Sequence, residues 1–316
     1  MKKRITPYQE IVALEDYQAA CRELSTILDI YRFSVSLAAH KDIYFGHGTD
    51  NAADECSFLI LGSLGLSCDF PENLWGASLT TCEKDMLASQ LYKRMEQQIP
   101  VPYLIQKAYF CGLPFYVDEN VLIPRSPIAE LIENRFSPWI EAERVHMILD
   151  LCTGSGCIAA ALSVAFPDAT VDAVDIDEKA LEIAQKNIID LDLEDCVFLF
   201  QSDGMDNLDD AKYDLIVSNP PYVSYEEMQT LPKEYLHEPK HALEADDKGL
   251  ALVHRILKDS AHRLKPGGIL VVEVGNSYPQ LMDRYPDMPF IWLEFERGGH
   301  GVFLLTAENL QAYYNL

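Results

Sequence analysis

Residues 149–160 read LDLCTGSGCIAA, and this stretch predicts the fold of the second half of the chain. An apolar strand ends at Asp150, and Gly154 and Gly156 follow in a GxGxxA spacing that opens a helix. Glycines at these positions let the backbone approach a ligand closely. Asp175 ends the next apolar segment, 21 positions after Gly154, where a carboxylate can accept hydrogen bonds from a ribose diol. The pattern predicts an adenosine-containing ligand across the carboxyl ends of two parallel strands.

The remainder of this half alternates apolar strands with helical segments. Beyond LDLC come the strands TVDAVD, VFLFQSD, YDLIVSNP and GILVVEV, which predict an α/β fold with a doubly wound parallel sheet. Two final strands, FIWLEFE and GVFLLT, are joined by RGGHG. Because this link is too short for a crossover helix, we expect an antiparallel pair.

The glycine motif alone does not separate NAD from S-adenosylmethionine, but two features favour the methyl donor. The Asp150 carboxylate suits a cationic sulfonium or ammonium group and would repel a pyrophosphate. An antiparallel end also differs from the six parallel strands of a dinucleotide domain. Asp203 closes the third strand, where it is either a partner for the adenine amino group or an exposed turn residue.

Residues 214–223 read DLIVSNPPYV, a strand that ends in Asn219, Pro220, Pro221 and Tyr222. The prolines have fixed φ and no N–H, so the segment is stiff and presents mainly acceptors, including the Asn219 side-chain oxygen. Such a pocket suits a planar group that carries –NH2, with Tyr222 covering its π face. A carboxamide and an adenine-like amine both qualify, and a proline-rich strand end with a packed tyrosine is the structural alternative.

The first half of the chain has a different pattern. Residues 1–105 carry apolar positions at helical spacing and predict an all-helical domain, with Thr6 and Thr81 as candidate N-caps. Residues 106–127 contain AYFCGLPFYV and NVLIPR, which predict a β-hairpin linker. Residues 128–316 form the predicted α/β domain.

Composition limits the class of function. The 25 basic and 50 acidic residues give a net charge of -25, which disfavours direct nucleic-acid binding and suits either a basic partner or simple solubility. The eight cysteines form no CxxC pair, so we expect reduced thiols and no metal site. No apolar run is long enough for a membrane span, and the first residues, MKKRITPYQEI, lack the apolar core of a signal peptide. We therefore expect a cytoplasmic protein.

NPPY after DLIVS, together with DLCTGSG, resembles the S-adenosylmethionine-dependent amino-methyltransferases. GHGTDNAADE, FCGLPFYVDENVLIPRSPI and EVGNS are more closely similar to the protein glutamine N(5)-methyltransferases that modify large-subunit ribosomal protein L-three. The resemblance runs nearly end to end. It implies a helical substrate-recognition domain, a hairpin linker and a Rossmann-like, seven-stranded methyltransferase domain.

The resemblance also implies roles for individual residues. Asn219 to Tyr222 would seat the glutamine amide, and Gly204 stands where the family usually has a bulky residue against the adenine. Arg125, in LIPRSP, either orients a carbonyl or carboxylate at the mouth of the site or is a surface arginine. The residues implied to bind the donor are Asp150, Thr153, Gly154, Gly156, Asp175 and Asn219.

The distribution of charged residues along the chain suggests electrostatic steering of the substrate. Residues 1–105 hold 9 basic and 14 acidic side chains, while residues 106–316 hold 16 and 36. A basic ribosomal protein would be steered toward the acidic second half, and we expect the free protein rather than the assembled subunit to be the substrate. His47 is a tempting catalytic residue, but it lies in the helical half, so a structural or recognition role is the expectation.

Two other functions remain open. An adenine N6-methyltransferase on DNA or RNA faces the same chemical problem but would need a basic groove. A non-catalytic S-adenosylmethionine-binding assembly factor would keep its role after loss of Asn219, whereas an enzyme would not.

Overall fold

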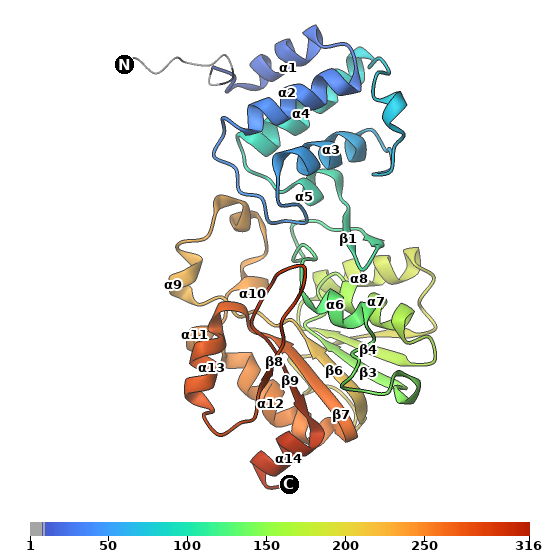
Figure 1. The fold of residues 1–316 in the computed structure, drawn as a ribbon, viewed down its shortest axis with the longest axis vertical. Coiled ribbons are helices and arrows are strands. Elements are labelled where there is room, and N and C mark those ends of the chain that lie inside the picture. The colour runs from blue at the N-terminus through green and yellow to red at the C-terminus, as the bar shows by residue number, and fades with distance from the viewer. Residues whose placement is uncertain (1–7, 9) are drawn as a thin grey trace. The chain divides into compact units, whose positions relative to one another are not determined.

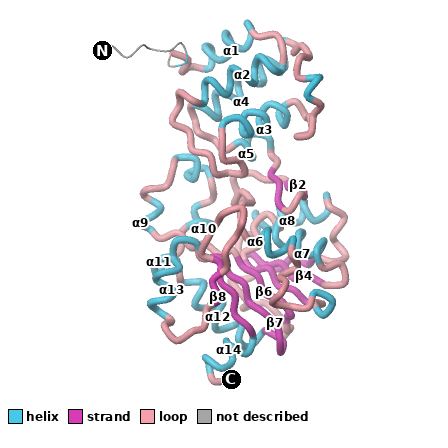
Figure 2. Tube along the Cα trace, in the orientation of Figure 1, coloured by secondary structure: helices cyan, strands magenta, loops and turns pink. Residues whose placement is uncertain are grey.

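The computed structural model describes residue 8 and residues 10–316, which form two compact units (Figures 1 and 2). The smaller unit comprises the chain up to Lys107 together with Pro232–His237. The larger unit comprises Ala108–Leu231 and Glu238–Leu316. Thr6, the expected first N-cap, lies outside the described residues.

The smaller unit is helical, and its helices enclose a core that includes Tyr17, Ile30, Leu59 and Leu91. The second expected N-cap is wrong by one residue. Thr80, not Thr81, caps α4, because a capping box needs its acidic residue three positions after the cap, and Glu83 takes that place. The helices of the first 107 residues are α1 (Leu14–Glu23), α2 (Ile27–Ala38), α3 (Ala52–Ser63), η2 (Glu72–Leu74), α4 (Thr81–Met95) and α5 (Val101–Ile105).

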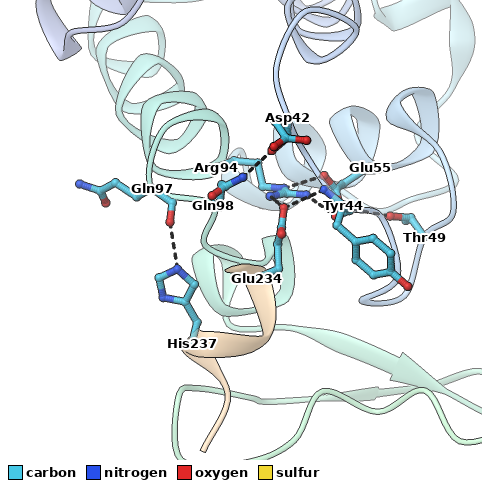
Figure 3. A network of polar contacts seen from close by, with 9 residues as sticks. All are labelled: Asp42, Tyr44, Thr49, Glu55, Arg94, Gln97, Gln98, Glu234 and His237. Carbon is cyan, nitrogen blue, oxygen red and sulfur yellow. Dashed lines mark hydrogen bonds and ion pairs between the residues drawn. The ribbon is translucent and has the colours of Figure 1, made fainter. Parts of the chain in front are cut away.

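A buried ion-pair network explains why a distant segment belongs to this unit (Figure 3). The Arg94 guanidinium is 1% exposed and lies 2.6 Å from the Glu55 carboxylate and 3.0 Å from that of Glu234. Arg94 also donates to the Tyr44 carbonyl at 2.8 Å, and the Tyr44 N–H donates to Glu234 at 2.9 Å. Glu234 lies in the 3₁₀ helix η4 (Lys233–His237), which the network fixes within the helical core.

The unit boundaries differ from the predicted domains in two ways. The β hairpin, predicted as part of a separate linker over residues 106–127, belongs to the larger unit. Pro232–His237, predicted to lie within the α/β domain, belongs to the smaller unit because Glu234 pairs with Arg94.

The larger unit contains a seven-stranded sheet with the order β5-β4-β3-β6-β7-β9-β8. Strands β3 to β7 are parallel, and β9 is antiparallel to both of its neighbours, so the predicted α/β fold and its antiparallel final pair are confirmed. The strands are β3 (Met147–Leu151), β4 (Thr170–Asp175), β5 (Val197–Gln201), β6 (Tyr213–Ser218), β7 (Leu264–Glu273), β8 (Ile291–Trp292) and β9 (Val302–Thr306).

Alternating side chains of the sheet fill two separate cores. Ile148 and Leu215 point into one core with α7, whereas Leu149 and Ile216 point into the other with α12 and α14. This arrangement is typical of parallel strands that helices cover on both faces. The helices are α6 (Ile128–Glu133), η3 (Ala142–Arg144), α7 (Cys157–Ala165), α8 (Glu178–Asp190), α9 (Tyr225–Met228), α10 (Lys240–Leu243), α11 (Asp246–Gly249), α12 (Ala251–Arg263), η5 (Gly275–Ser277), α13 (Tyr278–Arg284) and α14 (Ala307–Tyr314).

Only the first half of the predicted hairpin is β structure. Strands β1 (Ala108–Phe110) and β2 (Leu113–Phe115) pair around Gly112, but NVLIPR is not a strand. The reason is that the Ile123 N–H donates to the Glu238 side chain at 3.1 Å, and Pro124 has no N–H to offer to a sheet. The segment instead forms a wall of the pocket described below.

No helix in the described part of the chain is long and apolar enough to cross a membrane. Within residues 8 and 10–316, no cluster of three or more His, Cys, Asp and Glu side chains could hold a metal ion. All eight cysteines are free thiols.

Candidate active site

A pocket in the larger unit, with about 940 Å³ of empty space partly open to solvent, lies at the carboxyl ends of β3, β4, β5 and β6. The structure brings seven of the predicted site residues to its wall, whereas Asp150, Gly156, Pro220 and Tyr222 do not line it. The predicted residues that line the pocket are Arg125, Thr153, Gly154, Asp175, Asp203, Asn219 and Pro221.

Asp150 is completely buried beneath the glycine loop. Its Oδ2 accepts from the Thr153 hydroxyl at 2.6 Å and from the Ala159 N–H at 3.0 Å, while Oδ1 has no hydrogen-bond partner among the described residues. Burial raises the pKa of Asp150 to about 7, although Thr153 and Ala159 oppose the shift. A carboxyl group with an unused oxygen and a raised pKa is well suited to a neighbouring cation, which would stabilise its ionised form.

Both glycines of the motif have backbone conformations that favour glycine. Gly154 has φ +54° and Gly156 has φ +78°. A Cβ on Gly156 would lie 3.2 Å from the Ala184 Cβ, so this glycine allows α7 and α8 to pack closely. A Cβ on Gly154 would meet no atom within 4 Å, which leaves its side of the pocket open to a ligand.

Asp175 ends β4 at the pocket wall. One of its oxygens accepts from the Gly154 N–H at 2.8 Å and the other from the Asp177 N–H at 3.0 Å. Each carboxylate oxygen has a second lone pair, so Asp175 can still accept from a ligand diol. Burial raises the pKa of this carboxyl group.

Asp203 lines the pocket, but its side chain is already engaged. Arg255 donates to the Asp203 carboxylate at 2.7 Å and to its carbonyl at 2.9 Å. Arg255 also lies 3.4 Å from where a Cβ on Gly204 would be, so its guanidinium occupies the space beside this glycine. The sequence did not single out Arg255, because nothing in it shows that residues 52 positions apart come together.

Arg125 forms an ion pair within the protein. Its guanidinium makes two hydrogen bonds to the Glu238 carboxylate, at 2.5 and 2.7 Å. The Glu238 side chain is completely buried, whereas that of Arg125 is 22% exposed. The pair stiffens the pocket wall formed by residues 120–126.

The NPPY segment continues from β6 at the same sheet edge. Asn219 is half-buried, and among the described residues none hydrogen-bonds its side-chain amide. Ser218, directly before it, is buried and donates to the Leu151 carbonyl at 2.9 Å. The Asn219 oxygen is therefore available to a ligand and attached to a rigid strand end.

His47 does not belong to this pocket. It is 3% exposed in the smaller unit, where its ring lies 4.7 Å from that of Tyr235 and 6.5 Å from that of Tyr44. This placement supports a structural role in the smaller unit.

Comparison with known proteins shows the family. A family model described as "Methyltransferase small domain" matches residues 136–249, which include the glycine loop and NPPY. The chain is 47% identical to the ribosomal protein uL3 glutamine methyltransferase of Francisella tularensis subsp. tularensis over 297 residues, 94% of this chain and 95% of the relative. It is 46% identical to the protein of that name from Neisseria meningitidis serogroup B over 295 residues, 93% and 97% of the two chains.

The chain belongs to the ribosomal protein uL3 glutamine methyltransferase family.

This methyltransferase uses S-adenosyl-L-methionine as its methyl donor. The residues present fit the donor: the unpaired oxygen of Asp150 suits its cationic groups, and the open face of Gly154 leaves room for it. Asp175 retains acceptor capacity for the ribose hydroxyls.

Proposed function

We propose that this enzyme methylates the side-chain amide nitrogen of a glutamine in large-subunit ribosomal protein uL3. The likeness to the uL3 methyltransferases carries the proposal because it extends over 94% of the chain. It therefore includes the helical unit, which the methyl-transfer chemistry itself does not require.

The proposed donor site consists of Asp150, Thr153, Gly154, Gly156, Asp175 and Asp203, with Asn219 at its border. Bound there, the donor supplies an electrophilic methyl group on a sulfonium. Asp150 would balance the positive charge and Asp175 would hold the ribose. Asp203 would reach the adenine amino group through carboxylate lone pairs that Arg255 leaves free.

In the proposed substrate site, Asn219 and Pro221 would face the glutamine amide, and Pro220 and Tyr222 would hold them in place. The Asn219 oxygen and neighbouring carbonyls would accept both hydrogens of the glutamine –NH2, because the prolines place no competing N–H there. A bound amide loses planarity under this constraint, which frees its nitrogen lone pair. Arg125 would orient the substrate only with the guanidinium edge that Glu238 does not occupy.

The reaction then needs mainly alignment. The glutamine nitrogen would take the methyl group that the donor supplies, and the electron pair of the broken carbon–sulfur bond would stay on the sulfur as a neutral thioether. The nitrogen proton leaves late, to water or to an acceptor in the pocket, so no strong base is required. Near-attack positioning supplies up to ~7 to 11 kcal/mol of the barrier reduction.

We further propose that free uL3 in the cytoplasm is the substrate, because a glutamine loop must enter a narrow pocket and RNA packing would hinder it. The test is to incubate the protein with labelled donor and, separately, free uL3, assembled large subunits, DNA and RNA. We expect label in free uL3 alone. Label in a nucleic-acid base would support the adenine N6-methyltransferase alternative, which the acidic charge of the catalytic half disfavours. Equal labelling of free uL3 and subunits would reject the preference for free protein.

A further inference from the structure

Tyr222 is held at three points within the larger unit. Its hydroxyl donates to Glu273 Oε1 at 2.8 Å, and its carbonyl accepts from the Ser277 hydroxyl at 2.8 Å. Its ring lies on the backbone of Gly275, where an added Cβ would come within 2.5 Å of the ring. A tyrosine fixed at hydroxyl, carbonyl and ring has little rotational freedom.

Glu273 connects Tyr222 to a residue of the pocket wall. It ends β7, is 5% exposed and does not line the pocket. Its second oxygen accepts from the Ser126 hydroxyl at 2.5 Å. Ser126 lies in the wall formed by residues 120–126, so one buried carboxyl group ties that wall to the NPPY segment.

Because the NPPY segment is stiff, the contacts of Glu273 also fix the position of Asn219. Ser218 anchors one end of the segment by its bond to the Leu151 carbonyl, and Tyr222 anchors the other end. Between them, Pro220 and Pro221 have fixed φ. With both ends held, the acceptors that face the glutamine amide have one available position.

We propose that Glu273 is a positioning residue for methyl transfer, which acts by fixing Tyr222 and Ser126 and so the geometry of the amide pocket. This inference rests on the proposed function, since the reaction it serves is transfer to a glutamine amide. Glu273 touches neither donor nor substrate. It differs in this from Asn219, which lines the pocket.

The test is Glu273→Gln, which keeps the size of the side chain. A glutamine has one acceptor oxygen and one –NH2 donor in place of two acceptors, so one of the two hydroxyls, Tyr222 or Ser126, loses the oxygen to which it donates and has to reorient. We expect kcat on free uL3 to fall at least about tenfold, because sub-ångström misplacement in a positioned reaction has effects of this size. Donor Kd and the KM for uL3 should change by less than about twofold, since Glu273 contacts neither ligand.

A double-mutant cycle separates positioning from general destabilisation. Tyr222→Phe should lower kcat, and combining it with Glu273→Gln should lower kcat no further than Glu273→Gln alone, because the bond that Tyr222→Phe removes is one that Glu273 accepts. A second tyrosine–carboxylate pair of the same sheet serves as the matched control. Tyr213 donates to Asp172 at 2.8 Å outside the pocket, so Tyr213→Phe and Asp172→Asn should lower the melting temperature and leave kcat unchanged.

An activity-independent measurement keeps the two proposals distinguishable. Amide hydrogen exchange at Tyr222 and Val223 should quicken in Glu273→Gln but not in Asp172→Asn. If Glu273→Gln does not fold, Tyr222→Phe and Ser126→Ala remove the two hydrogen bonds of Glu273 one at a time without changing the carboxyl group, and each should lower kcat. Unchanged kcat and exchange in the folded variant would overturn the positioning role. A wild-type enzyme inactive on uL3 would instead contradict the proposed function, and hydrogen exchange would still decide the role of Glu273.

Discussion

Arg94 and Glu234 form a buried ion pair at 3.0 Å although 140 residues separate them in the chain. Glu55 shares the same guanidinium at 2.6 Å, so two carboxylates depend on one cation (Figure 3). Burial raises the pKa of Glu55, against the opposing effect of Arg94. The network therefore stabilises the helical unit only while all of its members are present.

Removal of the Arg94 guanidinium should lower the stability of the protein strongly. We expect Arg94→Met to lower the free energy of unfolding by about 3 to 5 kcal/mol, because it leaves two buried carboxylates uncompensated. Chemical denaturation monitored by circular dichroism measures this change. Arg22→Met is the matched control, since its ion pair with Asp85 is exposed. A loss as small for Arg94→Met as for Arg22→Met would contradict the importance of the buried network.

Asn219 should be essential for transfer but not for folding. We expect Asn219→Ala to reduce kcat about a hundredfold or more, because the pocket loses the acceptor that orients the amide. Steady-state assays with labelled donor and free uL3 measure the effect. Asn134→Ala, at an exposed position outside the pocket, should keep wild-type kcat. Full activity of Asn219→Ala would exclude the proposed amide pocket.

Donor binding should depend on pH through Asp150. Its folded pKa of about 7 lies above the usual value, so in the ligand-free protein the carboxyl group is mostly neutral below pH 7 and ionised above it. A cationic donor favours the ionised form, and Kd should therefore rise by up to about tenfold from pH 8 to pH 6. Titration calorimetry at several pH values measures this. In Asp150→Asn the difference should disappear, and a pH dependence that persists would assign it to another group.

The same carboxyl group should also make the free energy of unfolding depend on pH. This dependence runs opposite to that of donor affinity, which increases with pH. Because its folded pKa exceeds its unfolded value, the native state binds more protons between about pH 4 and pH 7. The contribution of Asp150 to the free energy of unfolding should thus decrease as pH rises through this window and stay constant above it. Comparing the pH dependence of unfolding in wild type and Asp150→Asn isolates this contribution.

Salt should weaken recognition of the protein substrate. Residues 106–316 carry 16 basic and 36 acidic side chains, and a basic substrate is attracted over a distance that ionic screening shortens. We expect the KM for uL3 to rise between 50 and 300 mM salt while kcat stays nearly constant. An unchanged KM would show that substrate capture does not depend on this charge.

The sheet and the gathering of Thr153, Gly154 and Asp175 at one pocket were predictable because their signals are local. The strand before Asp150, the glycines after it and the acid that ends the next strand all lie within a short stretch with a known spacing. The NPPY segment could also be recognised from the sequence. Two prolines directly after an apolar strand fix φ and remove two N–H donors, which indicates a stiff segment that presents acceptors.

The residues that sequence reasoning missed act through distant partners. Glu273 stands in EVGNS, but its bonds reach Tyr222 over 51 positions and Ser126 over 147 positions. Likewise, nothing in the sequence around Arg94 or Glu234 indicates that these two residues form an ion pair in the folded protein. NVLIPR was predicted as β structure from composition, whereas Glu238, which takes up one of its N–H groups, lies 115 positions further along the chain.

The chain passes between the two units three times, after Lys107, after Leu231 and after His237. Residues 1–107 alone contain Arg94 but not Glu234, the carboxylate that pairs with it. The helical unit therefore depends on six residues that lie far along the chain, Pro232–His237. Any fragment or chimaera that is meant to keep the helical unit intact has to include both pieces.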